Sequence, residues 1–235
     1  MRSLTLIAAL VAAITVPAAA NAGVGWTHDA FRNSTSSNWS GYSATGAAGA
    51  FTSVSASWIQ PMATCGFGQT AASFWVGLDG DGSQTVEQIG TYSNCTAANV
   101  PQYYAWFEMY PNPAYKTSLP VSPGDRMNAS VSVDKVGRFN LSITNSTRGW
   151  TASSTQRSTT AQRISAEMIA EAPSNSSGIV PLTNFGTVNF TSAKVNGAVL
   201  DSFNPDRIDM VSGGVTKAST GPLSNGAFSV TWKHT

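Results

Sequence analysis

The chain has 235 residues, of which only 13 are Lys or Arg and 12 are Asp or Glu, while 42% are hydrophobic. This composition is typical of a globular protein with a charge-poor surface. The formal net charge of +1 excludes a strongly basic surface for nucleic acid or an anionic membrane. Only two histidines are present, and both lie near the ends of the predicted fold: His28 and His234. We therefore expect no Ser-His-Asp triad, no histidine-rich zinc site, no other metal and no cofactor.

The first 22 residues are typical of a secretory signal peptide. Arg2 provides a positive start, residues 4–16 form an apolar run, and Ala20-Asn21-Ala22 is a small-x-small cleavage pattern. The apolar run is too short to span a bilayer, and no later segment offers about 18 uninterrupted apolar residues. The sequence therefore predicts a secreted, extracellular protein without a membrane anchor.

The mature chain divides into a short polar segment and one folded domain. Residues 23–37 form a polar lead-in or short pro-segment, and residues 38–235 form a single domain without internal repeats. We expect the mature protein to be a monomer.

The chain contains two cysteines, Cys65 and Cys95. Since an exported protein meets an oxidising compartment, and each cysteine has only the other as a partner, we predict a disulfide between them. Such a bond closes a loop of about 30 residues and stabilises the fold by about 3 to 4 kcal/mol.

Short strands separated by turn signals dominate the mature chain. They are rich in Val, Thr, Phe, Trp and Tyr, and turn clusters such as Gly80-Asp81-Gly82 lie between them. The predicted strands cover residues 50–60, 72–79, 84–91, 102–111, 126–134, 137–146, 185–191, 207–212 and 225–233. This spacing predicts an all-β fold, an antiparallel sandwich or barrel. Residues 161–171 stay ambiguous, because their composition suits either a helix or a strand.

Strand alternation separates two kinds of face. Around residue 106, one face carries large amphipathic rings beside an acid: Tyr104, Trp106, Glu108 and Tyr110. In the segment before residue 80, alternation likewise places one aromatic ring and one acid together: Trp75, Gly77 and Asp79. Such a mixture suits a sheet face that meets a ligand, whereas a wet outer sheet face with incidental aromatics is the structural alternative.

Without a usable histidine or cysteine, an enzyme with this sequence must work through carboxylates, amides or hydroxyls. A carboxylate can activate water, and a side-chain amide can stabilise an oxyanion. In the segment 84–90, alternation puts Gln84 and Gln88 on one face and Glu87 on the other. Glu87 is therefore a poor partner for Gln88.

Six segments, in order and with similar spacing, resemble the glutamic peptidases known as eqolisins. They are Asn38-Trp39-Ser40-Gly41-Tyr42, Trp75-Val76-Gly77-Leu78-Asp79-Gly80-Asp81, Gln88-Ile89-Gly90, Trp106-Phe107-Glu108-Met109-Tyr110-Pro111, Ala166-Glu167-Met168-Ile169-Ala170-Glu171 and Phe185-Gly186-Thr187-Val188. The resemblance implies a single-domain sandwich of two large antiparallel sheets, similar to the concanavalin-like jelly roll.

The resemblance also implies the site. The catalytic pair falls on Gln88 and Glu167, and the substrate-binding positions are Trp39, Trp75, Asp79, Glu108 and Tyr110. Two features differ from the fungal pattern. The stretch between Asp79 and Gln88 is about one residue shorter, which leaves Gln84 as a rival, and Met168 stands where a Trp is usual.

These features predict a secreted, cofactor-free endopeptidase that hydrolyses polypeptides at acidic pH. Glu167 acts as the general base towards water, and Gln88 stabilises the oxyanion. The alternative is a carbohydrate-binding or glycan-cleaving sandwich with Trp39, Trp75 and Trp106 as sugar platforms and an acid pair among Glu108, Glu167 and Glu171. Against it, the clustered E-x-D-x-x-E pattern of many β-sandwich glucanases is missing from the sequence. A catalytically inactive binding module is a third possibility.

Overall fold

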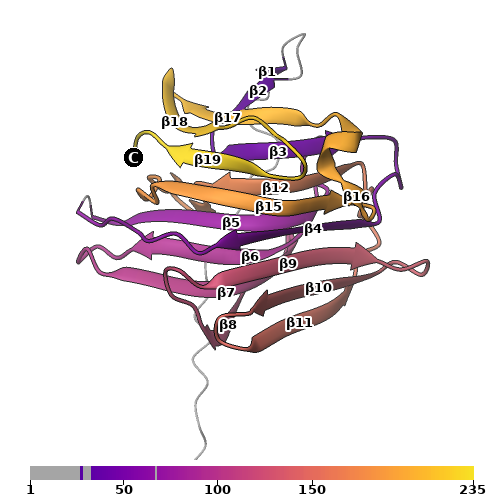
Figure 1. The fold of residues 1–235 in the computed structure, drawn as a ribbon, viewed down its shortest axis with the longest axis horizontal. Helices are drawn as coiled ribbons and strands as arrows, with labels where there is room; N and C mark the ends of the chain where they lie inside the picture. The colour runs from indigo at the N-terminus through magenta and orange to yellow at the C-terminus, as the bar shows by residue number, and fades with distance from the viewer. Residues whose placement is uncertain (1–26, 29–32, 67) are drawn as a thin grey trace, which may run out of the picture.

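The structure, a computed structural model, describes residues 27–28, 33–66 and 68–235 (Figure 1). The all-β architecture is confirmed, because strands account for every element of these residues except one 3₁₀ turn, η1 (Leu200–Phe203). Seventeen strands belong to one continuous hydrogen-bonded sheet, which curls into two layers. The predicted signal peptide, residues 1–22, lies outside the described residues.

The first layer runs in the hydrogen-bonding order β8–β7–β6–β5–β12–β3–β17, and all of these neighbours are antiparallel. The strands are β8 (Tyr115–Pro120), β7 (Pro101–Tyr110), β6 (Val86–Cys95), β5 (Thr70–Leu78), β12 (Ser165–Glu171), β3 (Trp39–Thr45) and β17 (Asp206–Ser212). Two further strands extend its β17 edge: β2 (Asn33–Ser36) and β1 (Thr27–His28).

The second layer runs in the order β18–β19–β15–β4–β9–β10–β11. Its strands are β18 (Val215–Thr220), β19 (Phe228–Trp232), β15 (Thr187–Val195), β4 (Ser53–Ile59), β9 (Arg126–Val133), β10 (Arg138–Asn145) and β11 (Trp150–Arg157). A short strand, β16 (Ala198–Val199), pairs with β15, and a separate hairpin joins β13 (Ser174–Asn175) to β14 (Gly178–Ile179).

One strand joins the two layers. β17 pairs with β3 through Asp206–Ile208 and, after an irregularity at Met210, with β18 through Met210–Ser212. The predicted sandwich is therefore one sheet that folds over at β17, not two separate sheets (Figure 1).

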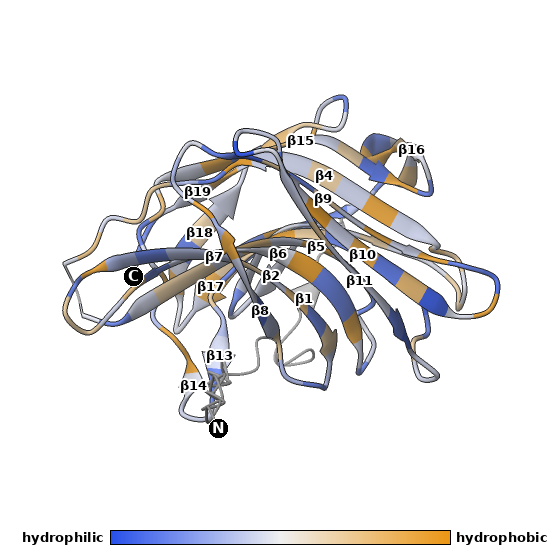
Figure 2. Ribbon diagram, turned by 90° about the horizontal axis from the view of Figure 1, so that it is seen from below, coloured by the Kyte–Doolittle hydropathy of each residue, from blue (hydrophilic) through white to orange (hydrophobic). Residues whose placement is uncertain are grey.

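The space between the layers is filled by apolar side chains. Alternate residues of β5 point into it, Phe74, Val76 and Leu78, and they join a large cluster with Val131 and Phe190 of the second layer. In Figure 2, β4, β9 and β15 lie over β5 and β6. We call this the inner face of the first layer, and the opposite side its outer face. Because side chains alternate along a strand, Trp75 and Gly77 lie on the outer face.

Two sequence expectations are resolved by the strand pairing. The ambiguous segment forms a strand, β12, because it pairs along its length with both β3 and β5. The lead-in predicted for residues 23–37 is not wholly outside the fold, since β2 pairs in parallel with Arg207–Met210 of β17. Its polar sequence, NSTS, carries no alternation that would reveal a strand.

The predicted disulfide is confirmed. Cys65 and Cys95 are bonded, with their Cα atoms 5.6 Å apart. The bond ties the loop before β5 to the end of β6, so it fixes one end of two central strands of the first layer.

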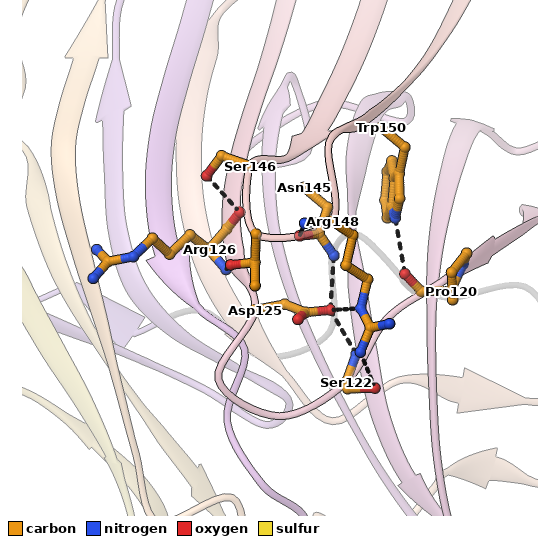
Figure 3. A network of polar contacts seen from close by, with 9 residues as sticks. Pro120, Ser122, Asp125, Arg126, Asn145, Ser146, Arg148 and Trp150 are labelled. Carbon is orange, nitrogen blue, oxygen red and sulfur yellow. Dashed lines mark hydrogen bonds and ion pairs between the residues drawn. The ribbon is translucent and has the colours of Figure 1, made fainter.

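At the edge opposite β17, side chains hold the two layers together (Figure 3). Trp150 of β11 donates its indole N–H to the carbonyl of Pro120 in β8, at 2.9 Å. Beside it, Asp125 Oδ2 accepts hydrogen bonds from Arg148 Nε at 2.6 Å, from Asn145 Nδ2 at 2.7 Å and from the Ser122 amide at 2.9 Å. Burial alone would raise the pKa of Asp125, but these hydrogen bonds outweigh it and lower the pKa.

We predict that Asp125→Ala lowers the free energy of unfolding by about 1 to 3 kcal/mol, because it strands the buried Asn145 amide and removes an acceptor from Arg148. Urea titration followed by circular dichroism measures the loss. The matched control is Asp134→Asn, which removes the charge of an exposed ion pair with Arg138 but keeps an oxygen for the backbone N–H groups of Val136 and Arg138, and it should change stability little. Equal losses in the two variants would contradict this account of the layer edge.

Candidate active site

A row of directly opposed residues crosses the outer face of the first layer. Glu108 of β7 pairs with Gln88 of β6, Gln88 pairs with Gly77 of β5, and Gly77 pairs with Glu167 of β12. Directly opposed residues of antiparallel strands send their side chains to the same face. The strand register therefore brings the two predicted catalytic residues together on either side of Gly77.

Gly77 keeps the centre of this row open. Neighbouring strands lie about 4.8 Å apart, so the backbones of Gln88 and Glu167 are about 10 Å apart. A Cβ atom on Gly77 would lie 2.9 Å from Cζ3 of Trp75 and 3.2 Å from Cβ of Gln88. Only glycine therefore leaves the Trp75 ring its place beside the two polar side chains.

Glu167 is completely buried, and its two carboxyl oxygens differ. The backbone N–H of Asp81 points at Oε1, at 3.4 Å, and also at the hydroxyl of Ser165, at 3.2 Å. Oε2 has no hydrogen-bond partner among the described residues. Burial raises the pKa of Glu167 well above its ordinary value; the Ser165 hydroxyl opposes the rise, and the neighbouring Asp81 adds to it.

Gln88 is also completely buried, and its amide contacts a carboxyl. Nε2 donates to Oε2 of Glu108 at 2.6 Å. The other oxygens, Oε1 of Gln88 and Oε1 of Glu108, have no hydrogen-bond partner among the described residues. Burial, and then the charge of Glu171, raise the pKa of Glu108 to about 9, although the Gln88 hydrogen bond lowers it. The row thus contains three buried polar atoms without a hydrogen-bond partner among the described residues: Oε2 of Glu167, Oε1 of Gln88 and Oε1 of Glu108.

Aromatic side chains occupy the next rows of the outer face. Trp75 packs edge to face against Trp39, with ring centroids 4.9 Å apart. Glu171 holds this pair, because its Oε2 accepts the indole N–H of Trp75 at 2.8 Å and its Oε1 accepts Nδ2 of Asn38 at 3.2 Å. Trp106 and Tyr104 belong to the same cluster, and the half-buried Tyr110 packs on it. The alternation expected for β7 is therefore confirmed.

Asp79 does not share this face. Alternation ends at Leu78, because the chain turns at Asp79 with a φ of +66°. Its carboxylate is buried and accepts the backbone N–H groups of Arg163 at 2.7 Å and Ile164 at 3.0 Å. The expectation that Asp79 lies beside Trp75 and Gly77 was wrong, and its oxygens bind the segment that leads into β12.

Gln84 likewise lies elsewhere. It is exposed in the turn before β6, whereas Gln88 sits within β6 beside Gly77. The predicted sharing of one strand face by Gln84 and Gln88 was therefore wrong, since the strand begins only at Val86. Glu87 lies on the opposite face from Gln88, as expected, and interacts with Asp79 and Ser158.

Three residues around the site were not singled out from the sequence: Asp81, Ser165 and Asn38. Asp81 and Asn38 do fall within the segments that carry the family resemblance, but their contacts depend on the turn after β5 and the start of β3. Ser165 has no local signal. Among residues 27–28, 33–66 and 68–235, no group of three or more His, Cys, Asp or Glu is placed to hold a metal ion. Within the same residues, no helix has the length and apolar character needed to cross a membrane.

Comparison with known proteins decides the family, because residues 37–232 match the Peptidase A4 family. The chain belongs to this family of glutamic peptidases. It is 30% identical to aspergillopepsin-2 of Aspergillus niger over 127 residues, which are 52% of this chain. The match spans 45% of the length of that relative.

Solved structures of glutamic peptidases have the same fold. Scytalido-glutamic peptidase, solved with a transition-state analogue inhibitor, has a TM-score of 0.73 and 27% identity; the match covers 84% of this chain and 98% of that one. The eqolisin SCP-B, in complex with the tripeptide Ala-Ile-His, has a TM-score of 0.68 and 26% identity, with the same coverage. Aspergilloglutamic peptidase from Aspergillus niger has a TM-score of 0.61 and 28% identity, covering 70% of this chain and 99% of that one.

For this family member, we predict that Gly77→Ala lowers both stability and any peptide-hydrolysing turnover. The added methyl group meets the buried Trp75 ring and the Gln88 side chain, and such overpacking costs about 1 to 3 kcal/mol. Thermal unfolding and the hydrolysis rate of a denatured protein substrate measure the two effects. Gly124→Ala is the control, because no atom lies within 4 Å of an added Cβ there, although its positive φ also strains the backbone. An unchanged rate in folded Gly77→Ala would show that the gap between Gln88 and Glu167 is not needed.

We also predict that the family member is most stable in acid. Burial raises the pKa of Glu87 from 4.5 to about 8 and that of Glu108 from 4.5 to about 9, and it raises the pKa of Glu167 well above its ordinary value. Above pH 4.5 the unfolded chain releases these protons while the folded chain keeps them, so the free energy of unfolding falls as pH rises from about 4.5 through 8 to 9. Below about pH 3.8, protonation of Asp125 works in the opposite direction. Urea midpoints measured from pH 3 to pH 9 test this, and a maximum at neutral pH would contradict it.

Proposed function

We propose that this protein is a secreted endopeptidase that hydrolyses peptide bonds at acidic pH with Gln88 and Glu167 as its catalytic dyad. The observation that carries the proposal is the cross-strand row in which these two buried side chains flank Gly77. Membership of the Peptidase A4 family supports it. The peptide complex of SCP-B and the inhibited form of scytalido-glutamic peptidase support polypeptides as the substrate class. One chain holds both members of the dyad, so we propose a monomeric enzyme.

In the proposed reaction, the scissile carbonyl carbon lies between the two side chains. Oε2 of Glu167, which has no partner among the described residues, accepts a proton from a water molecule as that water attacks the carbonyl carbon. The negative charge that forms on the carbonyl oxygen accepts a hydrogen bond from the Gln88 amide. Protonated Glu167 then donates its proton to the leaving nitrogen, and the carbon–nitrogen bond breaks.

The burial of Glu167 favours this cycle in two ways. A carboxylate with a raised pKa is a stronger base when it is ionised. Once it has taken the proton from water, it keeps that proton at acidic pH until the leaving nitrogen receives it. A water that donates to the bare Oε2 stabilises the ionised form and lowers the pKa in the complex. The site therefore needs no second carboxylate as a proton donor.

The remaining predicted positions have different tasks in this proposal. Tyr110 is partly exposed at the end of β7 and contacts substrate. Trp39 and Trp75 form the packed wall beside the dyad. Asp79 acts indirectly, because it holds the backbone at Arg163 and Ile164, just before the strand that carries Glu167.

Membership of the Peptidase A4 family weighs against the glycan alternative. Trp39, Trp75 and Trp106 are as deeply buried as Gln88 and Glu167, so burial does not distinguish the two functions. The Cys65–Cys95 disulfide supports secretion, since such bonds persist in oxidising compartments.

We predict that Glu167→Gln lowers kcat by about 10² to 10⁴ and that Gln88→Ala lowers it by about 10² to 10³, because the first removes the base and the second an oxyanion donor. Digestion of a denatured protein at acidic pH measures both, and a peptide-based transition-state analogue should inhibit the wild type.

The matched control is Gln84→Ala, which removes an exposed amide outside the row and should keep wild-type turnover. Circular dichroism confirms that each variant is folded. Wild-type turnover by folded Glu167→Gln would overturn the dyad, and a loss confined to Gln84→Ala would show that the wrong glutamine was chosen.

A further inference from the structure

Among the described residues, the amide of Gln88 has one hydrogen-bond partner, the carboxyl of Glu108. Nε2 lies 2.6 Å from Oε2 of Glu108, and the two residues are directly opposed in the β6–β7 ladder. We propose that Glu108 is a positioning residue, which holds the Gln88 amide with its nitrogen presented to the oxyanion. This inference rests on the proposed function, because it assigns a task to Glu108 in the same reaction.

The chemistry of the amide explains why a fixed orientation matters. A primary amide has two N–H groups on one side and a carbonyl oxygen on the other, and it can exchange them by rotating about χ3. One N–H donates to Glu108, which leaves the second N–H for the substrate oxygen. If the amide rotated, its carbonyl oxygen would face the developing negative charge and raise the barrier instead of lowering it.

Glu108 can hold the amide in either protonation state. An ionised carboxylate only accepts hydrogen bonds, so it always selects the nitrogen end of the amide. A protonated carboxyl still has lone pairs on its carbonyl oxygen, which can accept the same N–H. The contact therefore persists over the pH range in which the enzyme is proposed to work.

Burial argues that the carboxyl has a purpose beyond packing. Glu108 is 1% exposed, and its other oxygen, Oε1, has no partner among the described residues. Burying a carboxyl with one unpartnered oxygen costs stability, so a leucine or methionine would fill the same space at lower cost. The hydrogen bond that Oε2 of Glu108 accepts comes from the amide that the proposed reaction uses.

A double-mutant cycle tests the proposal. Glu108→Leu removes the acceptor while filling the space, and Glu108→Gln keeps a carbonyl oxygen that can accept from Gln88. We expect Glu108→Leu to lower kcat by about 10- to 100-fold with KM within about twofold, because misplacing a catalytic group costs up to about 10². Glu108→Gln should restore kcat to within about threefold of the wild type. In the Gln88→Ala background, Glu108→Leu should cost less than about twofold more, because its target is gone.

The control is Glu87→Gln, which changes a buried carboxyl in the neighbouring residue on the opposite face. Its effect should be the same in the wild-type and Gln88→Ala backgrounds. Thermal unfolding checks each variant, and Glu108→Met replaces Glu108→Leu in the cycle if the leucine variant does not fold.

The outcomes separate this inference from the proposed function. If Gln88→Ala turns over like the wild type, the dyad is wrong and Glu108 has no amide to position. If Gln88→Ala is impaired but Glu108→Leu keeps wild-type kcat, or costs the same factor in both backgrounds, or acts on KM alone, the dyad stands and the positioning role is overturned.

Discussion

The register of β6, β5 and β12 determines which side chains can meet on the outer face of the first layer. Gly77 opposes Gln88 on one side and Glu167 on the other. A slip of one residue in β12 would bring Met168 to the outer face and turn Glu167 into the apolar core. The register is held firmly, because each of these strands buries apolar residues such as Val76, Ile89 and Met168 between the layers. The core of the sandwich therefore positions the site, although none of its side chains takes part in the chemistry.

Burial of carboxyl groups connects the chemistry of the site with the stability of the fold. Glu108 and Glu167 are removed from solvent and have few donors around them, so their neutral forms are favoured. Glu87 has the same character on the opposite face of β6. In acid these carboxyl groups are neutral, and burying a neutral carboxyl destabilises the fold less than burying a charged one. At higher pH each group must either ionise while buried or keep a proton that the unfolded chain releases, and both lower the free energy of unfolding. The burial that raises the pKa of Glu167 is thus least costly in acid, where a water bound at Oε2 must favour the ionised form for Glu167 to act as the base.

Much of this arrangement follows from local sequence patterns, and the failures have identifiable physical causes. Alternation along β7 placed Trp106, Glu108 and Tyr110 on one face, because the unbroken pairing of β7 with β6 keeps the period of two. The same rule failed at Asp79, since the positive φ of this residue ends the alternation one residue before the Gly80-Asp81-Gly82 turn signal. Gln84 was misplaced because β6 begins only at Val86, so strand alternation does not extend to residue 84.

Long-range pairing is the information that the sequence did not supply. The polar strand β2 becomes visible only through its parallel pairing with β17, and β12 was ambiguous until its two neighbours, β3 and β5, were known. The pairing of Gln88 with Glu108 also links positions twenty residues apart, across a turn whose length local patterns did not determine. The family resemblance pointed to both proposed catalytic positions, but the contacts of their neighbours depend on the strand register.

The most direct test of the account is a crystal structure of the protein with a peptide-based transition-state analogue bound. The account predicts that the oxygen mimicking the oxyanion lies within hydrogen-bond distance of Nε2 of Gln88, and that the oxygen mimicking the attacking water lies within the same distance of Oε2 of Glu167. The account would be contradicted if other side chains bound the tetrahedral centre of the analogue and neither Nε2 of Gln88 nor Oε2 of Glu167 contacted it.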